Sequence, residues 1–192
     1  MPDQKSAHCS NSTPADHRGA TTRDGLPQVR PRRLSHVLLF TPDVLGALHF
    51  YEQALGLKLS DKSLDIIAFS HAPHGCDHRL VAFAKSSAKG WHHAAWEVDS
   101  IDEVGTGAVQ MAAAGHTKGW GTGRHCLGSN YFHYVQDPWG SFCEYSADMD
   151  YIGEGSEWPA GDYPPENSLY LCGPDVPDNF IFNTEVDIPA PA

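Results

Sequence analysis

The sequence predicts an α+β protein built from two copies of one unit, each consisting of a strand, a helix and further strands. The strand pattern "SHVLLF" precedes a helical pattern that stops at Gly56, and the same order returns from "HHAAWEV" to Gly115. His36 lies 20 residues before Gly56 and His93 lies 22 before Gly115, spacings that indicate a duplicated unit. Two such units can form half-sheets that curl around a shared cleft, which His36 and His93 would face from opposite sides.

The first unit is expected over about residues 34–87. After the strand "RLSHVLLF", the helix is predicted to begin with Thr41 as N-cap, Pro42 at the first helical position and Asp43 in the first turn. The glycine after the last apolar position is expected to end this helix. The runs "LDIIAFS" and "HRLVAFAK" predict further strands, separated by the turn-rich "HAPHGCD".

The second unit is expected over about residues 90–150. The strand "HHAAWEV" leads into a helix with an acidic start between Asp99 and Asp102, and Gly115 is expected to end it. The alternating runs "NYFHYVQD" and "SFCEYSA" are predicted strands that complete the unit.

Two segments flank this predicted domain of residues 34–150. Residues 1–33 are rich in Ser, Thr, Pro, Gly and charge and lack apolar periodicity, so we expect a flexible N-terminal extension. Residues 151–192 are heavy in Pro and Gly but also contain several aromatic side chains. Because disorder needs no such aromatics, we expect an irregular C-terminal tail packed on the domain, edging the cleft.

Charge and hydropathy argue against two kinds of partner. The formal net charge is −11, and residues 34–192 hold seven Lys/Arg against 21 Asp/Glu, a formal charge of −14. Such a body repels phosphate backbones, so we expect no nucleic-acid partner. No apolar run approaches the ~18 residues of a membrane span, and no apolar segment of a signal peptide is present. We therefore expect no membrane partner and a cytoplasmic location.

Three residues on the predicted strands could bind a metal together. Two histidines on equivalent strands and one carboxylate on a later strand are the ligand set of a non-haem Fe(II) site, with open positions for substrate and O₂. His36, His93 and Glu144 could supply it. Taken singly, a strand histidine is more often a satisfied core or surface residue, and a glutamate after a turn is usually solvated.

A motif near the end of the second unit strengthens the metal hypothesis. The stretch "GRHCLGSNYFHYVQDPWGSFCE" closely resembles the signature of the type I extradiol ring-cleavage dioxygenases of the vicinal oxygen chelate superfamily. It departs from that signature at His133, where the family normally has an aliphatic residue or Phe. The positions that match are Gly123, His125, Tyr134, Asp137, Pro138, Gly140 and Glu144.

The resemblance extends upstream of this motif. "WHHAAWEV" is similar to the family's His-His strand and implies that His93 binds the metal, with His92 as a non-ligating neighbour. "SHVLLFTPDV" is similar to the first ligand strand and implies His36 as the other ligand. "HRLVAFA", 15 residues before His93, resembles the segment that begins with the family's acid–base histidine, which implies that role for His78.

What the resemblance implies is a specific enzyme. The fold would be that of a compact one-domain member, with paired βαβββ modules forming a half-barrel cleft. The activity would be extradiol cleavage of a catechol by O₂ at Fe(II), with Mn(II) as an alternative, in aromatic compound degradation, by a homo-oligomer. His78 would move protons, and His125 and Tyr134 would hydrogen-bond the substrate. Because the sequence shows no obvious cationic pocket, an apolar catechol such as a biphenyl-type or alkyl-substituted diol is favoured.

Two rival functions use the same paired modules. One is a glyoxalase-like isomerase or thiol transferase that uses Zn, Ni or Mn, which does not require His78, His125 and Tyr134 together. The other is a metal-free binding protein of the bleomycin-resistance type, and three intact candidate ligands argue against it.

Overall fold

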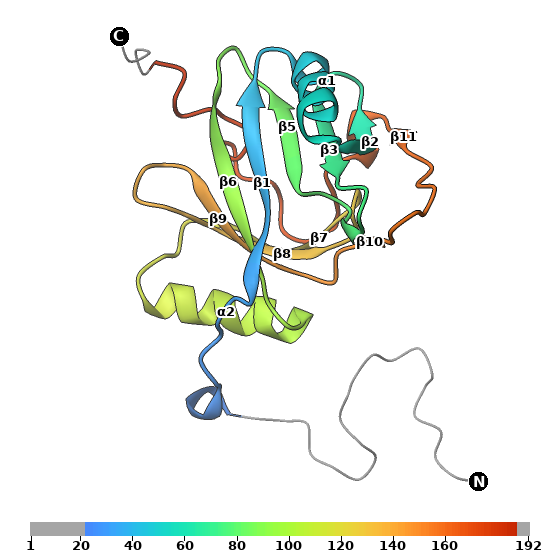
Figure 1. Ribbon diagram of the computed structural model, residues 1–192. Helices are drawn as coiled ribbons and strands as arrows, with labels where there is room; N and C mark the ends of the chain where they lie inside the picture. Colours follow the sequence, from blue (N-terminus) through green and yellow to red (C-terminus); the bar gives the residue numbers. More distant parts are fainter. Residues whose placement is uncertain (1–21, 188–192) are drawn as a thin grey trace, which may run out of the picture.

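The computed structural model describes residues 22–187, and in this range two α-helices pack on a curved ten-stranded sheet (Figure 1). After the short 3₁₀ turn η1 (Arg23–Gly25), the first unit contains β1 (Arg33–Thr41), α1 (Val44–Leu55), β2 (Lys58–Ser63), β3 (Ile67–His71), β4 (Cys76–Asp77) and β5 (Val81–Lys85). The second contains β6 (Gly90–Glu97), α2 (Ile101–Ala113), β7 (Gly119–His125), β8 (Tyr131–Gln136) and β9 (Phe142–Ala147). The elements that follow are β10 (Tyr151–Ile152), β11 (Gly161–Asp162), η2 (Pro165–Asn167) and β12 (Tyr170–Cys172).

The strand order confirms the predicted duplication. The large sheet runs β11-β2-β3-β5-β1-β6-β9-β8-β7-β12, so β1-β5-β3-β2 in one half mirrors β6-β9-β8-β7 in the other. In each half the first strand pairs in parallel with the last, and the two first strands, β1 and β6, pair antiparallel with each other. This junction joins the halves into one curved sheet, with α1 and α2 on separate halves (Figure 1). The paired βαβββ architecture is therefore confirmed.

The start of α1 differs from the prediction. Thr41 and Pro42 precede the helix, and Asp43 is the N-cap: its backbone is extended and its side chain accepts a hydrogen bond from the Gly46 N–H at 2.9 Å. The helix therefore begins at Val44, two residues later than predicted, because the carboxylate of Asp43 rather than the side chain of Thr41 caps its first turn. The predicted end is confirmed, because Gly56 adopts the left-handed conformation at φ 69°, which glycine reaches without strain.

Strand β2 was not predicted, because its buried positions are polar. Ser60, Asp61 and Ser63 are buried, so "KLSDKS" shows no apolar alternation. Partners inside the domain make this burial tolerable: the Ser60 hydroxyl lies 2.8 Å from the His71 Nδ1. Strand β3 begins three residues after Leu64, the expected start, because Leu64 lies in a turn at φ 49°.

The end of the predicted extension is packed on α2. Val29 is only 3% exposed and joins an apolar cluster with Val98 and Val104. Its backbone is tied to the Gln110 side chain by hydrogen bonds of 2.9 and 3.2 Å. The predicted flexible extension of residues 1–33 is therefore docked around residue 29, while residues 1–21 lie outside the described range.

The tail after residue 150 adds strands to both ends of the large sheet. β11 pairs with β2 and β12 pairs with β7. Phe180 is buried among Trp120, Tyr134 and Phe142 and also lines a cavity of the domain. As a result, both halves of the sheet contact the tail. Neither described helix has the length and apolar character needed to cross a membrane.

We predict that Val29→Ala lowers the free energy of unfolding by roughly 1–2 kcal/mol, because two buried methyl groups are lost. Urea denaturation of the full chain measures this change. The exposed neighbour Gln28 provides the control, and Gln28→Ala should change stability by less than about 0.5 kcal/mol. Equal stability of the two variants would mean that Val29 does not dock in solution.

Candidate metal centre

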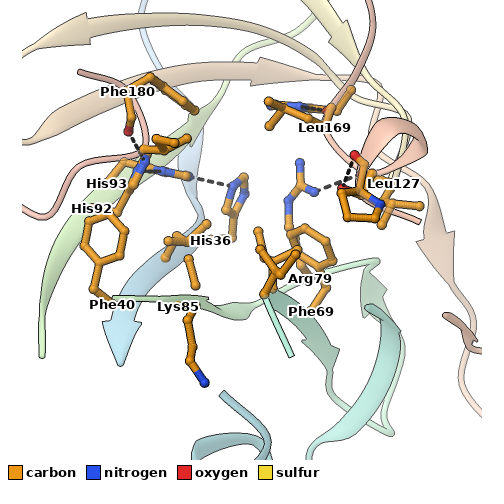
Figure 2. A pocket seen from close by; sticks show the side chains of 18 residues that line it. His36, Phe40, Phe69, Arg79, Lys85, His92, His93, Leu127, Leu169 and Phe180 are labelled. Carbon is orange, nitrogen blue, oxygen red and sulfur yellow. Dashed lines mark hydrogen bonds between the residues drawn. The ribbon is translucent and has the colours of Figure 1, made fainter. Parts of the chain in front are cut away.

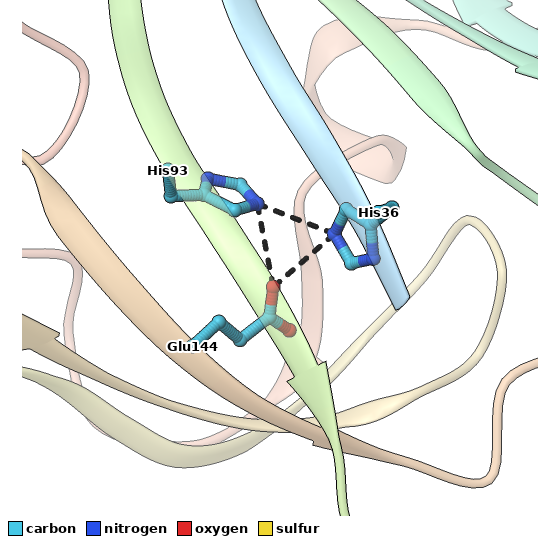
Figure 3. A group of neighbouring side chains, drawn as sticks. All are labelled: His36, His93 and Glu144. Carbon is cyan, nitrogen blue, oxygen red and sulfur yellow. Dashed lines mark hydrogen bonds and ion pairs between the residues drawn. The ribbon is translucent and has the colours of Figure 1, made fainter. Parts of the chain in front are cut away.

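Three neighbouring strands bring His36, His93 and Glu144 to one face of the sheet (Figure 3). Ala95 on β6 pairs with His36 on β1 and with Glu144 on β9, so these residues form one row across the strands. His93 precedes Ala95 by two residues on β6 and therefore points to the same face. The methyl group of Ala95 leaves the space over the middle of the row free for the three larger side chains.

The three side chains converge on one point. The Nε2 atoms of His36 and His93 lie 3.2 Å apart, and they lie 3.2 and 3.3 Å from Glu144 Oε2. All three residues are buried, and the candidate ligand atoms lie within 4.8 Å of one another. Glu144 Oε2 accepts no hydrogen bond within the described chain, although it is buried. A buried carboxylate oxygen without a donor, facing two imidazole nitrogens, fits a divalent metal ion.

The protonation states of the group also fit a metal. Burial lowers the pKa of His36 to about 3, so its imidazole is neutral at pH 7 and its Nε2 can carry a lone pair. Burial acts to raise the pKa of Glu144, but His36 and His93 hold it well below the usual range, so the group is a carboxylate. Neutral imidazoles and one carboxylate are the protonation states that metal coordination requires.

Neighbouring groups determine which nitrogen of His93 carries the proton. His92 Nε2 lies 2.8 Å from the carbonyl oxygen of Phe180, and a carbonyl can only accept, so this nitrogen carries the hydrogen. The Nδ1 of neutral His92 is then an acceptor, and it lies 2.7 Å from His93 Nδ1, which must donate. This leaves the lone pair of His93 on Nε2, the atom that faces Glu144. Such orientation of a ligand by its outer hydrogen bond is typical of metal sites.

A buried amide holds the other oxygen of Glu144. Asn130 is fully buried, and its Nδ2 donates to Glu144 Oε1 at 2.9 Å and to Ser146 Oγ at 2.9 Å. Its Oδ1 accepts a hydrogen bond from Arg79 Nη2. Asn130 thereby fixes the carboxylate with Oε2 turned toward the two histidines.

His125 and Tyr134 form a hydrogen-bonded pair beside the three candidate ligands. His125 Nδ1 donates to the Leu169 carbonyl at 2.7 Å, which leaves Nε2 to accept from the Tyr134 hydroxyl at 2.9 Å. Burial lowers the pKa of His125 to about 4 and raises that of Tyr134 well above its ordinary value, so both groups are neutral at pH 7. The Tyr134 ring stands 5.2 Å from the His93 ring.

A cavity of about 310 Å³ opens in front of these groups (Figure 2). Its polar wall includes His36, His93, His125 and Arg79. Its remaining wall is mainly apolar and includes tail residues; the apolar side chains are Leu38, Phe40, Ile66, Ile67, Phe69, Ala84, Leu127, Pro165, Leu169, Phe180 and Ile181. The volume lies at the lower end of the range for small-molecule sites and suits a substituted ring.

Of the predicted site residues, His78, Tyr134 and Glu144 do not line the cavity, and His78 alone of these three contacts none of the lining histidines. It is fully buried, its Nε2 lies 2.6 Å from Asp61 Oδ2, and its neighbour Arg79 lines the cavity instead. From β5 the cavity is lined by Ala84 and Lys85, and β5 begins only at Val81. Residues 78–80 bend, so the side-chain alternation of the strand does not extend back to His78. The acid–base role of His78 stays a prediction.

Sequence reasoning missed Arg79 and Asn130. Both lie inside stretches in which other residues carry the family resemblance, "HRLVAFA" and "GRHCLGSNYF". A charged residue directly before an apolar strand was the available signal for Arg79. His133, where the motif departs from the family, is half-buried and its Nδ1 has no hydrogen-bond partner in the described chain.

Sequence comparison identifies the family of this fold. Residues 33–145 match the model of the Glyoxalase/Bleomycin resistance protein/Dioxygenase superfamily, and the chain belongs to this superfamily. The chain is 64% identical over 184 residues to Metapyrocatechase 2 of Cupriavidus necator. The aligned residues cover 96% of this chain and 58% of the relative. The chain thus spans somewhat over half the length of this curated relative.

Solved structures share the fold at lower identity. The Mn(II)-bound glyoxalase from Novosphingobium aromaticivorans superposes with a TM-score of 0.69 at 24% identity, over 91% of this chain and 54% of that one. The 2,2',3-trihydroxybiphenyl 1,2-dioxygenase from the dibenzofuran-degrading Sphingomonas wittichii strain RW1 gives a TM-score of 0.64 at 22% identity, over 75% and 50% of the chains. The α+β fold of paired βαβββ modules that the motif implied is confirmed.

We predict that His78→Phe lowers the free energy of unfolding by about 1–3 kcal/mol, because it removes a donor from the buried Asp61 carboxylate. The Gly161 N–H would remain as a donor to Asp61, at 2.7 Å. His78→Gln, which retains a side-chain N–H, should lose less, and urea denaturation compares the two. A His78→Phe variant with unchanged stability and bound metal but without catalytic turnover would instead support the acid–base role.

Proposed function

We propose that this chain carries the catalytic site of an Fe(II)-dependent extradiol dioxygenase, which cleaves a catechol beside its diol and incorporates both atoms of O₂. The convergence of two imidazoles and one carboxylate on a single buried point is the observation that carries the proposal. The matching motif around His125, Tyr134 and Glu144 and the name of the 64% identical relative, a metapyrocatechase, also support it.

His36 Nε2, His93 Nε2 and Glu144 Oε2 are the atoms that would hold the ion. A bound ferrous ion supplies a Lewis acid that favours loss of a catechol proton and a redox centre that reacts with O₂. The residues are prepared for this ion before it binds, since Phe180 and His92 direct the lone pair of His93 and Asn130 directs Glu144. Fe(II) rather than Mn(II) is part of the proposal.

His125 and Tyr134 would orient the substrate and its intermediates. Because Nδ1 of His125 is committed to the Leu169 carbonyl, its Nε2 is the nitrogen that can accept a proton from, or share one with, a group in the cavity. The Tyr134 hydroxyl can donate either to His125 or to a substrate oxygen. Both are buried, so water competes little for these hydrogen bonds.

The apolar walls favour an aromatic substrate. Phe40, Phe69 and Phe180 offer ring faces, and Leu38 and Leu127 offer aliphatic surface. This lining supports a catechol with an apolar substituent, of the alkyl or biphenyl type, as the substrate. A cytoplasmic location and a homo-oligomeric state remain predictions.

One experiment separates this proposal from its rivals in the superfamily. The purified chain is loaded with Fe(II) without air, and catechol and then air are added. A dioxygenase consumes O₂ and forms a ring-opened product that absorbs visible light. A glyoxalase-like isomerase does neither, and a metal-free binding protein also fails to retain iron; either result would overturn the proposal.

We predict that Glu144→Ala retains less than about a tenth of the iron of the wild type, because a ligand is lost and the two imidazoles alone bind weakly. A colorimetric chelator assay after gel filtration measures the iron per chain, and circular dichroism verifies folding. The exposed Glu154 provides a charge-matched control, since Glu154→Ala should keep full iron content. Stoichiometric iron in Glu144→Ala would remove this residue from the site.

We predict that Tyr134→Phe keeps its iron but loses about 10²-fold or more in turnover, because the ring stays packed while the hydroxyl that faces His125 is lost. Oxygen uptake measures turnover. Tyr131→Phe removes the same atom from the same strand, where the hydroxyl lies near Arg124 and not near His125, and should change turnover by less than about twofold. Equal activity of the two variants would exclude Tyr134 from the reaction.

A further inference from the structure

The cavity contains a buried arginine without an acidic partner. Arg79 is 3% exposed, and its guanidinium points into the cavity that His36 also lines (Figure 2). Its Nη1 donates to the Leu127 carbonyl at 2.9 Å and its Nη2 to Asn130 Oδ1, but its Nε has no hydrogen bond. Within residues 22–187 it forms no ion pair. Three of the five guanidinium N–H groups are thus unused by the described chain.

Another arginine in the same domain shows the usual arrangement. Arg33 is nearly half exposed, and it nevertheless pairs with two carboxylates, Asp77 and Glu97. A fully buried cation needs such pairing more, because the loss of hydration is far larger. Partners from the fold therefore leave Arg79 short of negative charge, at a position where its side chain lines the cavity.

The guanidinium is held rigidly. It stacks on the Phe69 ring, with the guanidinium carbon 4.9 Å from the ring centroid. The chain passes close by at Gly128, where φ is 78° and an added Cβ would stand 3.3 Å from Arg79 Nη1. Through Asn130, which bonds both Arg79 and Glu144 Oε1, its position is also fixed relative to a candidate metal ligand. Such preorganisation is typical of groups that receive a ligand.

The charge balance of the cavity favours an anion. Burial lowers the pKa of the Arg79 guanidinium, and Glu144 is the acidic group that opposes this effect most strongly. A divalent ion bound to Glu144 would more than neutralise the charge of that carboxylate. Lys85 also lines the cavity, but it is half exposed and pairs with Asp65 at 2.9 Å. Because the walls beside Arg79 are apolar, its charge is weakly screened there.

We propose that Arg79 is a specificity-determining residue that hydrogen-bonds an anionic oxygen of the aromatic substrate. This inference rests on the proposed function and amends the expectation that the cavity has no cation for an acidic group. The anionic oxygen has two sources, a carboxylate on the ring or an ionised hydroxyl of the diol. The planar fork of the guanidinium fits a carboxylate, which can accept two parallel hydrogen bonds.

The test compares iron-loaded Arg79→Gln with the iron-loaded wild type on two substrates, 2,3-dihydroxybenzoate and 3-methylcatechol. Binding is measured by calorimetry without O₂, and kcat/KM is measured by oxygen uptake. We expect Arg79→Gln to weaken binding and kcat/KM for the acid by about 10- to 100-fold, the range for a hydrogen bond to a charged group. Arg79→Lys keeps the positive charge and should recover part of the lost affinity for the acid. It also provides a second test should Arg79→Gln fail to fold.

Arg124→Gln provides the matched control. Arg124 also lacks an acidic partner in the described chain and bonds the Ser129 carbonyl and hydroxyl, but it does not line the cavity. Its replacement should change both substrates by less than about twofold. Iron content and melting temperature are measured for every variant on the same preparations.

Each outcome bears on the proposal. A loss confined to the acid supports a ring carboxylate as the partner, and an equal loss for both substrates with full iron supports an ionised hydroxyl. Unchanged binding of both substrates overturns the proposal, and so does a loss that only follows the loss of iron, because Arg79 would then act through Asn130 on Glu144. A wild type that binds both compounds but cleaves neither refutes the proposed function, while the binding comparison still tests Arg79.

Discussion

The antiparallel pairing of β1 with β6 is the constraint on which the site depends. This pairing joins the two duplicated halves, and it places β6 between β1 and β9, the strands that carry His36 and Glu144. Each candidate ligand belongs to a different strand, so no single hairpin could assemble them. Hydrogen bonds along the row through Ala95 hold the three backbones in register, and the pleat directs the three side chains to one face. Loss of this register by one residue would turn a ligand away from the others.

The tail contributes to the site through its backbone. The Phe180 carbonyl determines the proton position on His92 and, through it, on His93, and the Leu169 carbonyl does the same for His125. Carbonyl oxygens are acceptors at every pH, so they impose one tautomer on each ring. The apolar contacts of Phe180 with Trp120 and Phe142 hold that carbonyl in place. The most irregular part of the described chain therefore controls where protons lie at the centre of the sheet.

Asn130 connects the negative and positive charges of the cavity. It donates to Glu144 and accepts from Arg79, so a neutral amide separates two buried ions that would otherwise pair directly. A direct ion pair would occupy the carboxylate and the guanidinium with each other. The inserted amide leaves Glu144 Oε2 directed at the histidines and leaves guanidinium donors free for the cavity. The same arrangement supports both the proposed metal site and the proposed anion contact.

The sequence by itself determined the duplicated architecture and the three converging candidate ligands. Both depend on local patterns: apolar alternation, helix stops such as Gly56, and a motif whose spacing places Glu144 on the strand after a tight turn. It could not determine strand β2, where Ser60 and Asp61 are buried because of partners from distant segments. It could not determine which side chain of residues 78–80 lines the cavity, which in the structure is that of Arg79. Only the tertiary structure decided these points, because burial of a polar group depends on hydrogen-bond partners that pairing of distant strands and the tail supplies.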